Sequence, residues 1–252
     1  MHVIGGPPPG LPAPERYELP LLDRRTESPT AMTFRFSTEG TGFRYLSNQA
    51  VRLHLPGVDD PWGAVRTFSL SSSPSEADLL AVTCKISDTP FKQALARLEP
   101  GETAVVFGPI GRFLFDADRP AVFVAGGIGV TPFRGMLRYA ADTEAPGPLT
   151  LLHSARVPEE LVFRPELEAL ARDRPGIELH YTVTRGEDPA APWTGARGRI
   201  DRASLEKFGR PERRPRWYVA GLPDMVSAVV RSLVQELAVP ETDVKYEIFR
   251  GF

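Results

Sequence analysis

The sequence predicts two successive domains: an antiparallel β-barrel, then an α/β domain built on a doubly wound parallel sheet. At 252 residues the chain is long for one core and fits two domains of ordinary size. Short β-rich runs between Gly, Pro, Ser and Asp fill the first half, whereas strands and helices alternate in the second. We expect a flexible Pro/Gly-rich segment over 1–16, the barrel domain over 17–116 and the α/β domain over 117–252.

Six β-rich runs in the first half are expected to form the barrel. They cover residues 17–28, 31–38, 49–57, 64–72, 78–87 and 103–109. Only 89–98 has helical spacing, with Phe91, Ala94, Leu95 and Leu98 on one face. Many strands with a single helix are typical of a small closed or nearly closed barrel.

The second half alternates apolar strands with amphipathic helices. Strands are expected at 119–127, 149–155, 177–185, 216–221 and 244–249, and helices at 131–142, 158–173, 201–209 and 223–237. This alternation predicts a parallel sheet covered by helices on both faces.

Composition and charge narrow the class of protein. A hydrophobic content of 42% and a charged content of 25% are those of a globular protein, and the net charge of −2 gives no field favouring nucleic acid or an anionic membrane. The most apolar stretch, 120–133, is too short and glycine-rich to span a bilayer, and the N-terminus lacks a signal-peptide pattern. We therefore expect a cytoplasmic protein that binds no nucleic acid and does not insert into membranes.

The single cysteine, Cys84, restricts redox and metal chemistry. One thiol excludes an internal disulfide, a four-cysteine zinc site and a cysteine-ligated iron–sulfur cluster, and we expect no metal site. Cys84 lies in a predicted strand and is interpreted as a small buried residue. A monomer is favoured, because the sequence has no coiled-coil heptad or long apolar stripe.

The strongest local signal is the stretch "VFVAGGIGVTPF". A buried strand runs into Gly126, Gly127 and Gly129, and Thr131 and Pro132 open a helix. Glycines let the backbone approach a ligand, and the N–H groups at a helix start favour an anion such as a dinucleotide pyrophosphate. The pattern is not GxGxxG, and the alternative is a glycine-rich turn without a ligand.

The stretch "RTFSLSSSP" places a cation and an aromatic ring beside several hydroxyls. Arg66 is suited to a phosphate, Phe68 offers a ring face, and Ser69 can form a hydrogen bond with a ring nitrogen. Strand alternation puts Thr67 and Ser69 on the opposite side from Arg66 and Phe68. By itself, the stretch favours the interpretation as a polar strand end, and Ser71–Ser73 are interpreted as a loop.

A second anion site is predicted where Thr89 and Pro90 open the early helix. The alternative there is an ordinary N-cap without a ligand.

Taken together, the two halves resemble the ferredoxin–NADP reductase family from about Tyr17 to Phe252. The resemblance is carried, in order, by "RTFSLSS", "KISDTPFKQAL", "GPIGRF", "GGIGVTP", "AGLPDM" and "YEIFRGF". These segments are similar to the family's flavin strand, its helix under the flavin pyrophosphate, the turn before the domain boundary, the nicotinamide-nucleotide turn, the C-G-P-P-x-M segment and the terminal E-x-F-x-G-aromatic segment.

The resemblance implies an FAD-binding barrel domain. It places Arg66 on the flavin phosphate, Phe68 against the flavin and Ser69 near its N5. The other residues that it assigns to the flavin site are Thr67, Thr83, Lys85 and Thr89. Because the helix-opening site suits a pyrophosphate, FAD is favoured over FMN, which stays an alternative.

The resemblance also implies a nicotinamide nucleotide on the α/β domain. Gly221 and Met225 join the glycine turn at this site. Hydroxyls and arginines that suit the 2′-phosphate of NADP follow two neighbouring strands, namely Ser154, Arg156, Thr184 and Arg185, and Arg197 lies within reach. NADP is therefore favoured over NAD.

The implied catalytic residues are Ser69, Glu247 and Phe252. Ser69 supports the flavin N5, Glu247 orients a hydroxyl network or relays a proton, and Phe252 covers one flavin face. The alternatives are a solvated strand-end glutamate and a frayed terminus. The sequence departs from the family at Ala220, where the family has cysteine, and at Leu222, where it has proline.

The function implied is a flavin-dependent reductase that takes hydride from NAD(P)H and passes electrons to a separate carrier, such as ferredoxin, flavodoxin or an oxygenase component. An NAD(P)H:flavin reductase that uses free flavin is a second enzyme hypothesis. A redox-sensing or regulatory subunit with low turnover and a binding module without flavin are the non-enzymatic alternatives.

Overall fold

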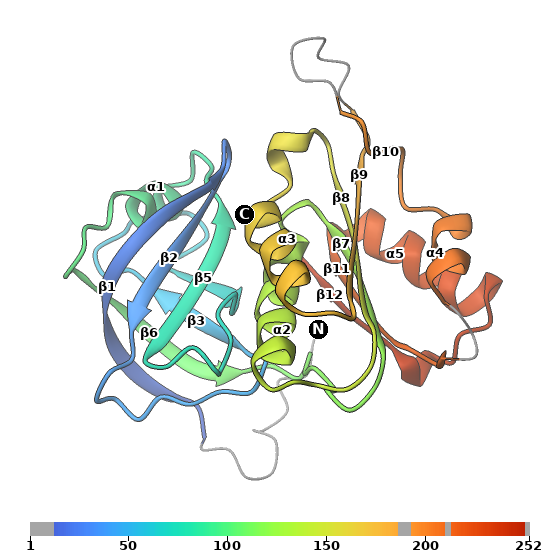
Figure 1. Cartoon of the computed structure of the whole chain (residues 1–252). Helices are drawn as coiled ribbons and strands as arrows, with labels where there is room; N and C mark the ends of the chain where they lie inside the picture. The colour runs from blue at the N-terminus through green and yellow to red at the C-terminus, as the bar shows by residue number, and fades with distance from the viewer. Residues whose placement is uncertain (1–12, 186–192, 210–212, 250–252) are drawn as a thin grey trace. The chain divides into compact units, whose positions relative to one another are not determined.

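The chain folds into two compact units, each with its own sheet (Figure 1). The computed structural model describes residues 13–185, 193–209 and 213–249. The first unit extends to Phe115 and includes Arg134–Tyr139, and the second holds Asp116–Phe133 and the described residues from Ala140 onward. No helix in the described ranges is long and apolar enough to cross a membrane.

The first unit contains a six-stranded antiparallel sheet, with the order β4-β3-β6-β1-β2-β5. The strands are β1 (Glu15–Ser28), β2 (Ala31–Ser37), β3 (Ala50–His54), β4 (Val65–Ser69), β5 (Leu79–Lys85) and β6 (Thr103–Ile110). Beyond β4, Leu70 forms a bridge with Val82 of β5, and the Ser71 N–H donates to the Ala81 carbonyl at 2.9 Å. These contacts join the two outer strands, so the sheet closes on itself.

The closed sheet surrounds an apolar core. Its most deeply buried members include Leu19, Phe34, Phe36 and Val82, all fully buried. The helix α1 (Pro90–Arg97) contributes Phe91 and Leu95 to this core. The early helix was predicted from this spacing of apolar residues, and the structure confirms it.

The second unit contains a six-stranded parallel sheet with the order β10-β9-β8-β7-β11-β12. The strands are β7 (Ala121–Gly126), β8 (Leu149–Ala155), β9 (Ile177–Val183), β10 (Ala196–Arg197), β11 (Arg216–Gly221) and β12 (Val244–Ile248). The strand order reverses between β7 and β11, which defines a topological switch point. The predicted fold class is confirmed.

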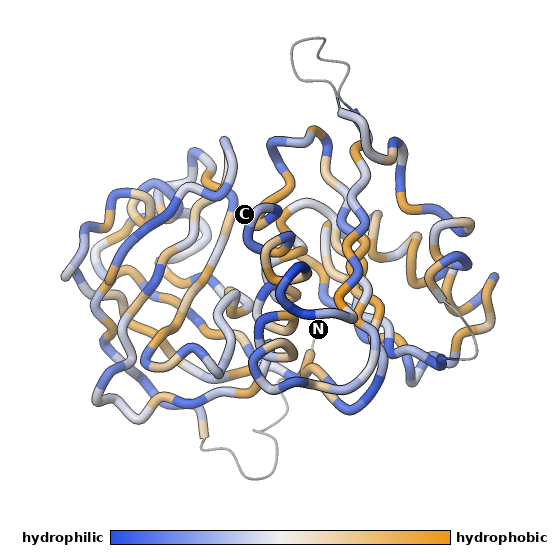
Figure 2. Tube along the Cα trace, viewed as in Figure 1, coloured by the Kyte–Doolittle hydropathy of each residue, from blue (hydrophilic) through white to orange (hydrophobic). Residues whose placement is uncertain are grey.

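Helices cover both faces of the parallel sheet (Figure 1). They are α2 (Thr131–Asp142), α3 (Arg164–Asp173), α4 (Arg202–Gly209) and α5 (Pro223–Arg231). Alternate residues of β7 pack against helices on opposite faces of the sheet. Val122 and Val124 belong to the apolar cluster with α4 and α5. On the other face, the ring centroid of Phe123 lies 5.2 Å from that of Phe133 in α2. Figure 2 shows apolar residues concentrated along these strands.

Two predicted helices differ in extent from the structure. The helix expected over 158–173 begins at Arg164, after a 3₁₀ turn at Pro158–Glu160 and a left-handed Phe163 with φ 63°. Pro165 explains the late start, since proline is tolerated in a first helical turn but not in an interior. The helix expected over 223–237 is α-helical to Arg231 and continues as a π-helix at Ser232–Glu236.

Candidate nucleotide and flavin sites

The glycine turn lies at the switch point of the parallel sheet. Gly126 ends β7 and Gly221 ends β11, the two neighbouring strands between which the order reverses. The chain then forms a 3₁₀ turn, η1 (Gly127–Val130), that runs directly into α2. In open α/β sheets, ligands bind outside the carboxyl ends of the strands at this point.

Close backbone contacts explain two of these glycines. A Cβ on Gly129 would lie 2.2 Å from the Ala220 carbonyl oxygen, and one on Gly221 would lie 3.2 Å from the Gly126 oxygen. Gly127 differs, because its φ of 53° is left-handed and the space around its absent Cβ is open for 4 Å. The turn therefore packs tightly on one side and leaves the backbone approachable on the other.

The other predicted residues of this site lie at the start of α2 or against the glycine turn. Thr131 begins α2 with 2% of its surface exposed, and Pro132 follows in the first turn, where it removes no useful donor. Met225 in α5 contacts the same turn, since its Sδ lies 3.3 Å from the Cβ position of Gly126. The structure thus brings together the predicted residues of the turn with Gly221 and Met225.

His153 forms a hydrogen bond with the glycine turn. It was not among the predicted site residues. This residue of β8 is fully buried, and its Nε2 lies 3.0 Å from the Gly127 carbonyl oxygen. Because a carbonyl only accepts, Nε2 carries the proton and donates. Burial lowers the pKa of His153 to about 4, although the bond to Gly127 acts in the opposite direction. A polar residue inside the apolar run "LTLLHSA" was the available sequence signal.

The predicted NADP-phosphate residues gather at the carboxyl ends of β8 and β9. Ser154 pairs in register with Gly126 and with Thr182. Beyond the strands, the Thr184 N–H donates to the Ala155 carbonyl at 3.0 Å, and the Arg185 N–H donates to the Arg156 carbonyl at 2.7 Å. The side chains of Arg156, Thr184 and Arg185 belong to exposed residues. These hydroxyls and guanidinium groups thus lie at the same sheet edge as the glycine turn.

Of the two predicted catalytic residues in the C-terminal segment, the structure describes one, Glu247. Glu247 lies in β12, in register with Ala220 of β11, and is half-buried. Phe252 lies outside the described residues. Ala220 itself is fully buried, whereas Leu222 after it is 54% exposed.

In the first unit, Arg66 is held in a dense set of interactions. Its Nη2 donates to Asp60 Oδ1 at 2.7 Å, and its Nη1 donates to the carbonyl oxygens of Trp62 and Gly63 at 3.0 and 2.5 Å. The guanidinium lies 5.0 Å from the centroid of the Phe91 ring. Its Nε is buried and lacks a partner among the described residues.

Asp60 connects Arg66 to the start of α1. Its Oδ2 accepts the Phe91 N–H at 2.9 Å, and Oδ1 also accepts the Trp62 N–H at 2.8 Å. Burial alone raises the pKa of this carboxyl group, but the hydrogen bonds from Phe91, Trp62 and Arg66 prevail and lower it. Asp60 therefore stays ionised and joins the two predicted anion-binding elements, Arg66 and the first turn of α1.

The neighbouring flavin-strand residues divide into buried and exposed ones. Phe68 is buried in the core, with the Lys92 ammonium 4.6 Å from its ring centroid. Ser69 is 9% exposed, whereas Thr67 and Lys85 are exposed. Thr89 caps α1, accepting the Lys92 N–H at 3.4 Å.

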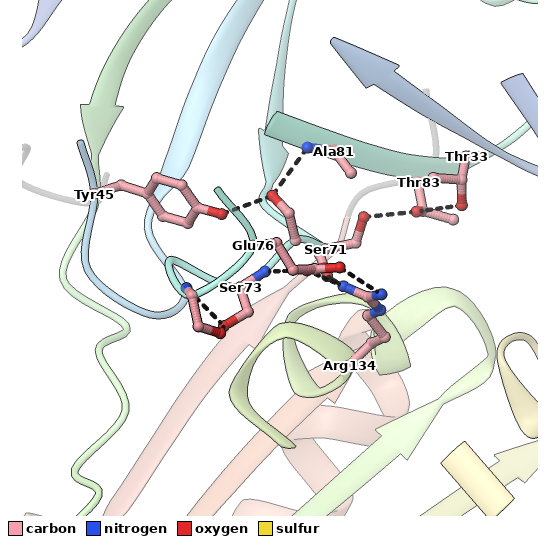
Figure 3. Close-up of polar contacts among 10 residues, drawn as sticks. Thr33, Tyr45, Ser71, Ser73, Glu76, Ala81, Thr83 and Arg134 are labelled. Carbon is pink, nitrogen blue, oxygen red and sulfur yellow. Dashed lines mark hydrogen bonds and ion pairs between the residues drawn. The ribbon is translucent and has the colours of Figure 1, made fainter. Parts of the chain in front are cut away.

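The serine stretch after β4 is part of the barrel structure (Figure 3). Ser71 and Thr83 share a hydroxyl–hydroxyl bond of 2.8 Å, and Thr83 shares another of 2.8 Å with Thr33. Ser72 accepts from the Tyr45 hydroxyl at 2.8 Å and from the Ala81 N–H at 2.9 Å. The hydroxyl of Thr83, which was predicted to contact the cofactor, is thus engaged in a buried chain that supports β4.

Residues of α2 anchor the same stretch. Arg134 forms an ion pair with Glu76, with one contact of 2.9 Å between Nη2 and Oε1, and its Nη1 also donates to the Ser71 carbonyl at 3.2 Å. A Cβ on Gly135 would lie 2.6 Å from the Ser72 carbonyl oxygen. These contacts fix the chain that directly follows the predicted flavin strand.

Comparisons with known proteins agree with this architecture. The family model described as an oxidoreductase NAD-binding domain matches residues 123–231. Ferredoxin–NADP reductase B of Sorangium cellulosum is 36% identical over 246 residues, which cover 92% of this chain and 97% of that protein. The chain belongs to the ferredoxin–NADP reductase family. As a member, it is an NAD(P)H-dependent flavoprotein reductase with FAD and a nicotinamide nucleotide as cofactors.

Other relatives share part of their length or the fold alone. The glycine betaine monooxygenase reductase subunit of Chromohalobacter salexigens is 36% identical over 169 residues, covering 65% of this chain and 45% of that protein, so the match spans about half of the subunit. A ferredoxin–NADP⁺ reductase from Neisseria gonorrhoeae, solved with bound FAD and NADP, superposes with a TM-score of 0.72 at 22% identity over 92% of this chain and 98% of that one.

The described residues of the reductase fit both cofactors. The open backbone at Gly127 suits a phosphate above a helix start, and the unsatisfied Nε of Arg66 suits a phosphate oxygen on the first unit. The predicted family, fold and enzyme class are confirmed, whereas the individual site residues stay predictions.

Proposed function

We propose that this reductase takes hydride from NADPH, in preference to NADH, and delivers electrons one or two at a time to a separate protein carrier. The observation that carries the proposal is the edge formed by the carboxyl ends of β7, β8 and β9. A glycine turn, two hydroxyls and two arginines meet there, and no carboxylate occupies residues 153–157. An acidic side chain at the end of β8 would instead favour the ribose diol of NAD.

On this proposal each group at the edge has a separate task. The N–H groups of η1 and the first turn of α2 bind the nucleotide pyrophosphate, and His153 holds the Gly127 carbonyl in place. Arg156 and Arg185 bind the 2′-phosphate, with Ser154 and Thr184 donating hydroxyl hydrogen bonds. Met225 packs beside the turn and limits its movement.

The first unit binds the flavin on the same proposal. Arg66 and the first turn of α1 bind the FAD phosphates, with Thr67, Lys85 and Thr89 around them, and Ser69 forms a hydrogen bond with the flavin ring. Phe68 and the Ser71–Thr83 pair support this strand from the core side. FAD when bound accepts a hydride from nicotinamide and releases electrons, so the protein supplies binding and orientation. Glu247 and Phe252 are retained as proposed catalytic residues.

The electron acceptor is proposed to be ferredoxin, flavodoxin or the terminal component of an oxygenase. The named relatives include a ferredoxin–NADP reductase and a monooxygenase reductase subunit, which supports a carrier on a separate chain. We further propose that the reductase acts as a cytoplasmic monomer. A reductase of free flavin would lose its flavin on gel filtration, whereas the proposed enzyme retains one FAD per chain.

The direct test is an anaerobic titration of the purified yellow protein with NADPH and, separately, with NADH, followed by visible absorbance. We expect NADPH to bleach the bound-flavin band more efficiently than NADH. Equal efficiency would contradict the assignment of the arginines, and a flavin that neither nucleotide bleaches would contradict the hydride step.

A matched pair of variants tests whether Arg185 causes the preference for NADPH over NADH. Removing one phosphate-binding guanidinium, in Arg185→Ala, is expected to raise the KM for NADPH roughly tenfold or more and to leave the KM for NADH unchanged. The control is Arg172→Ala, which removes an exposed arginine of α3. Equal effects of the two variants would show that Arg185 acts only through general charge.

A further inference from the structure

Two polar side chains on neighbouring strands each bury an atom that has no partner among the described residues. One atom is Nδ1 of His153 in β8, and the other is the hydroxyl of Tyr181 in β9. The two residues pair in register, and their ring centroids lie 6.1 Å apart. Unpartnered buried polar atoms are rare in native proteins, so a pair of them in neighbouring side chains requires an explanation.

The two atoms have complementary hydrogen-bonding capacities. Nε2 of His153 donates to the Gly127 carbonyl at 3.0 Å. Because burial lowers the pKa of His153, the ring is neutral near pH 7 and Nδ1 can only accept. Burial raises the pKa of Tyr181 above its ordinary value, so its hydroxyl stays protonated and can donate. One internal water molecule satisfies both groups, since it accepts from the hydroxyl and donates to the imidazole.

The Tyr181 ring is held in place by its surroundings. It packs against the apolar cluster of Ala155, Leu161 and Val183. On α3, the guanidinium of Arg164 lies 5.5 Å from the Tyr181 ring centroid. These contacts restrict the ring, so the hydroxyl is presented in a preorganised position near the imidazole.

The Gly127 carbonyl that His153 binds belongs to the same peptide group as the N–H of Ile128. In a trans peptide these two groups point in opposite directions, so a carbonyl held by the buried imidazole directs the N–H toward the open side of the turn. Gly127 has a φ of 53° and open space around its absent Cβ, and glycine also tolerates the flipped peptide. The flip would present a carbonyl oxygen, in place of an N–H donor, to a bound anion.

We propose that a buried water molecule links the Tyr181 hydroxyl to Nδ1 of His153, and that this chain keeps the N–H of Ile128 directed at the nucleotide pyrophosphate. The water occupies the lone pair of Nδ1 and so fixes the tautomer that carries its proton on Nε2. Tyr181 and His153 are then positioning residues that act through the glycine turn. This inference rests on the proposed nucleotide site and adds to it a residue of β9.

The first test compares nucleotide affinities of the FAD-loaded protein by calorimetry. Tyr181→Phe removes the hydroxyl and keeps the ring. We expect the Kd values for NADP⁺ and NAD⁺ to rise by the same factor, about three- to tenfold, as for the loss of one hydrogen bond, because both dinucleotides carry the pyrophosphate. The control, Tyr246→Phe, removes a hydroxyl from an exposed tyrosine of β12 and should leave both values unchanged.

The second test reads the tautomer by nitrogen-15 NMR of histidine-labelled protein, a measurement that a loss of packing alone would not change. In the wild type, His153 is expected to show a protonated Nε2 and an unprotonated, hydrogen-bonded Nδ1. In Tyr181→Phe the Nδ1 signal should shift toward that of a nitrogen without a hydrogen bond. The signals of His153 are assigned by their absence from His153→Gln.

The outcomes separate this inference from the function on which it rests. A wild-type His153 that is protonated on Nδ1 overturns the water link, and this result does not depend on whether any variant folds. An Nδ1 signal that is unchanged in a folded Tyr181→Phe overturns the link as well, and unchanged affinities overturn the positioning role. A wild-type protein that binds FAD but neither nucleotide overturns the proposed nucleotide site itself.

Discussion

At the residue scale, the buried His153 beside the glycine turn makes the free energy of unfolding depend on pH. Its pKa in the folded protein is about 4, below the ordinary 6.5, so between these values the unfolded chain takes up a proton that the folded chain does not. The free energy of unfolding should therefore fall as the pH drops from about 6.5 to 4, by about 3 kcal/mol from this group. Above that window His153 is neutral in both states and contributes no pH dependence.

Urea unfolding at several pH values, followed by tryptophan emission, measures this effect. His153→Gln keeps an N–H donor for the Gly127 carbonyl and cannot titrate, so its stability should fall less over the same window. Asp60 and Asp201, whose pKa values are lowered, contribute acid sensitivity to both proteins, and the difference between the two curves isolates His153. Parallel curves would contradict the assignment.

At the element scale, the packing of η1 against β11 depends on the absence of a side chain at Gly129. In Gly129→Ala the new methyl group would lie 2.2 Å from the Ala220 carbonyl oxygen, so η1 or β11 must move. We expect a loss of about 1–3 kcal/mol in unfolding free energy, as for other overpacked sites, and weaker NADP⁺ binding by calorimetry with FAD binding retained.

Gly209→Ala is the control for that variant. It also adds a methyl group in the second unit, but the nearest atom, of Trp217, lies 3.4 Å away at an ordinary contact distance. A Gly129→Ala protein as stable as this control would show that the turn tolerates a side chain.

Also at the element scale, an ion pair joins Arg134 of α2 to Glu76, in the segment after β4. Their side chains are only 15% and 20% exposed, so each charge depends on the other. A double-mutant cycle with Arg134→Met and Glu76→Gln, measured by urea unfolding, is expected to give a coupling energy of about 1–2 kcal/mol. A coupling near zero would mean that each group is already satisfied by its other partner, the Ser71 carbonyl for Arg134 and the Ser73 N–H for Glu76.

At the scale of the whole molecule, two units with separate cores should respond separately to the two cofactors. Hydrogen exchange is expected to show that FAD protects amides over 60–92, and that NADP⁺ protects those over 126–131, 154–156 and 183–185. Each expected range contains residues that are proposed above to bind the cofactor named. Protection of the second unit by FAD alone would contradict the division of the sites.

The same scale shows what local patterns can predict. Strand runs, the amphipathic α1 and the glycine turn follow from neighbouring residues, and so the fold class and this turn were accessible from sequence. The Asp60–Arg66–Phe91 cluster and the buried hydroxyl chain through Thr83 were not, because both join segments that are distant in the chain. Ser71–Ser73 therefore read as a loop, although all three are buried.

The single cysteine of the sequence, Cys84, is buried, and this has a practical consequence for labelling experiments. The thiol is 5% exposed, and burial raises its pKa while the nearby Lys92 ammonium offsets this only in part, as expected for a small buried residue. Native protein should therefore react slowly with maleimides. Cysteines introduced at exposed positions, such as Glu39→Cys on the first unit and Arg172→Cys on the second, would then be the only sites labelled by a fluorophore pair. Energy transfer between them would report directly on any movement of the units during turnover.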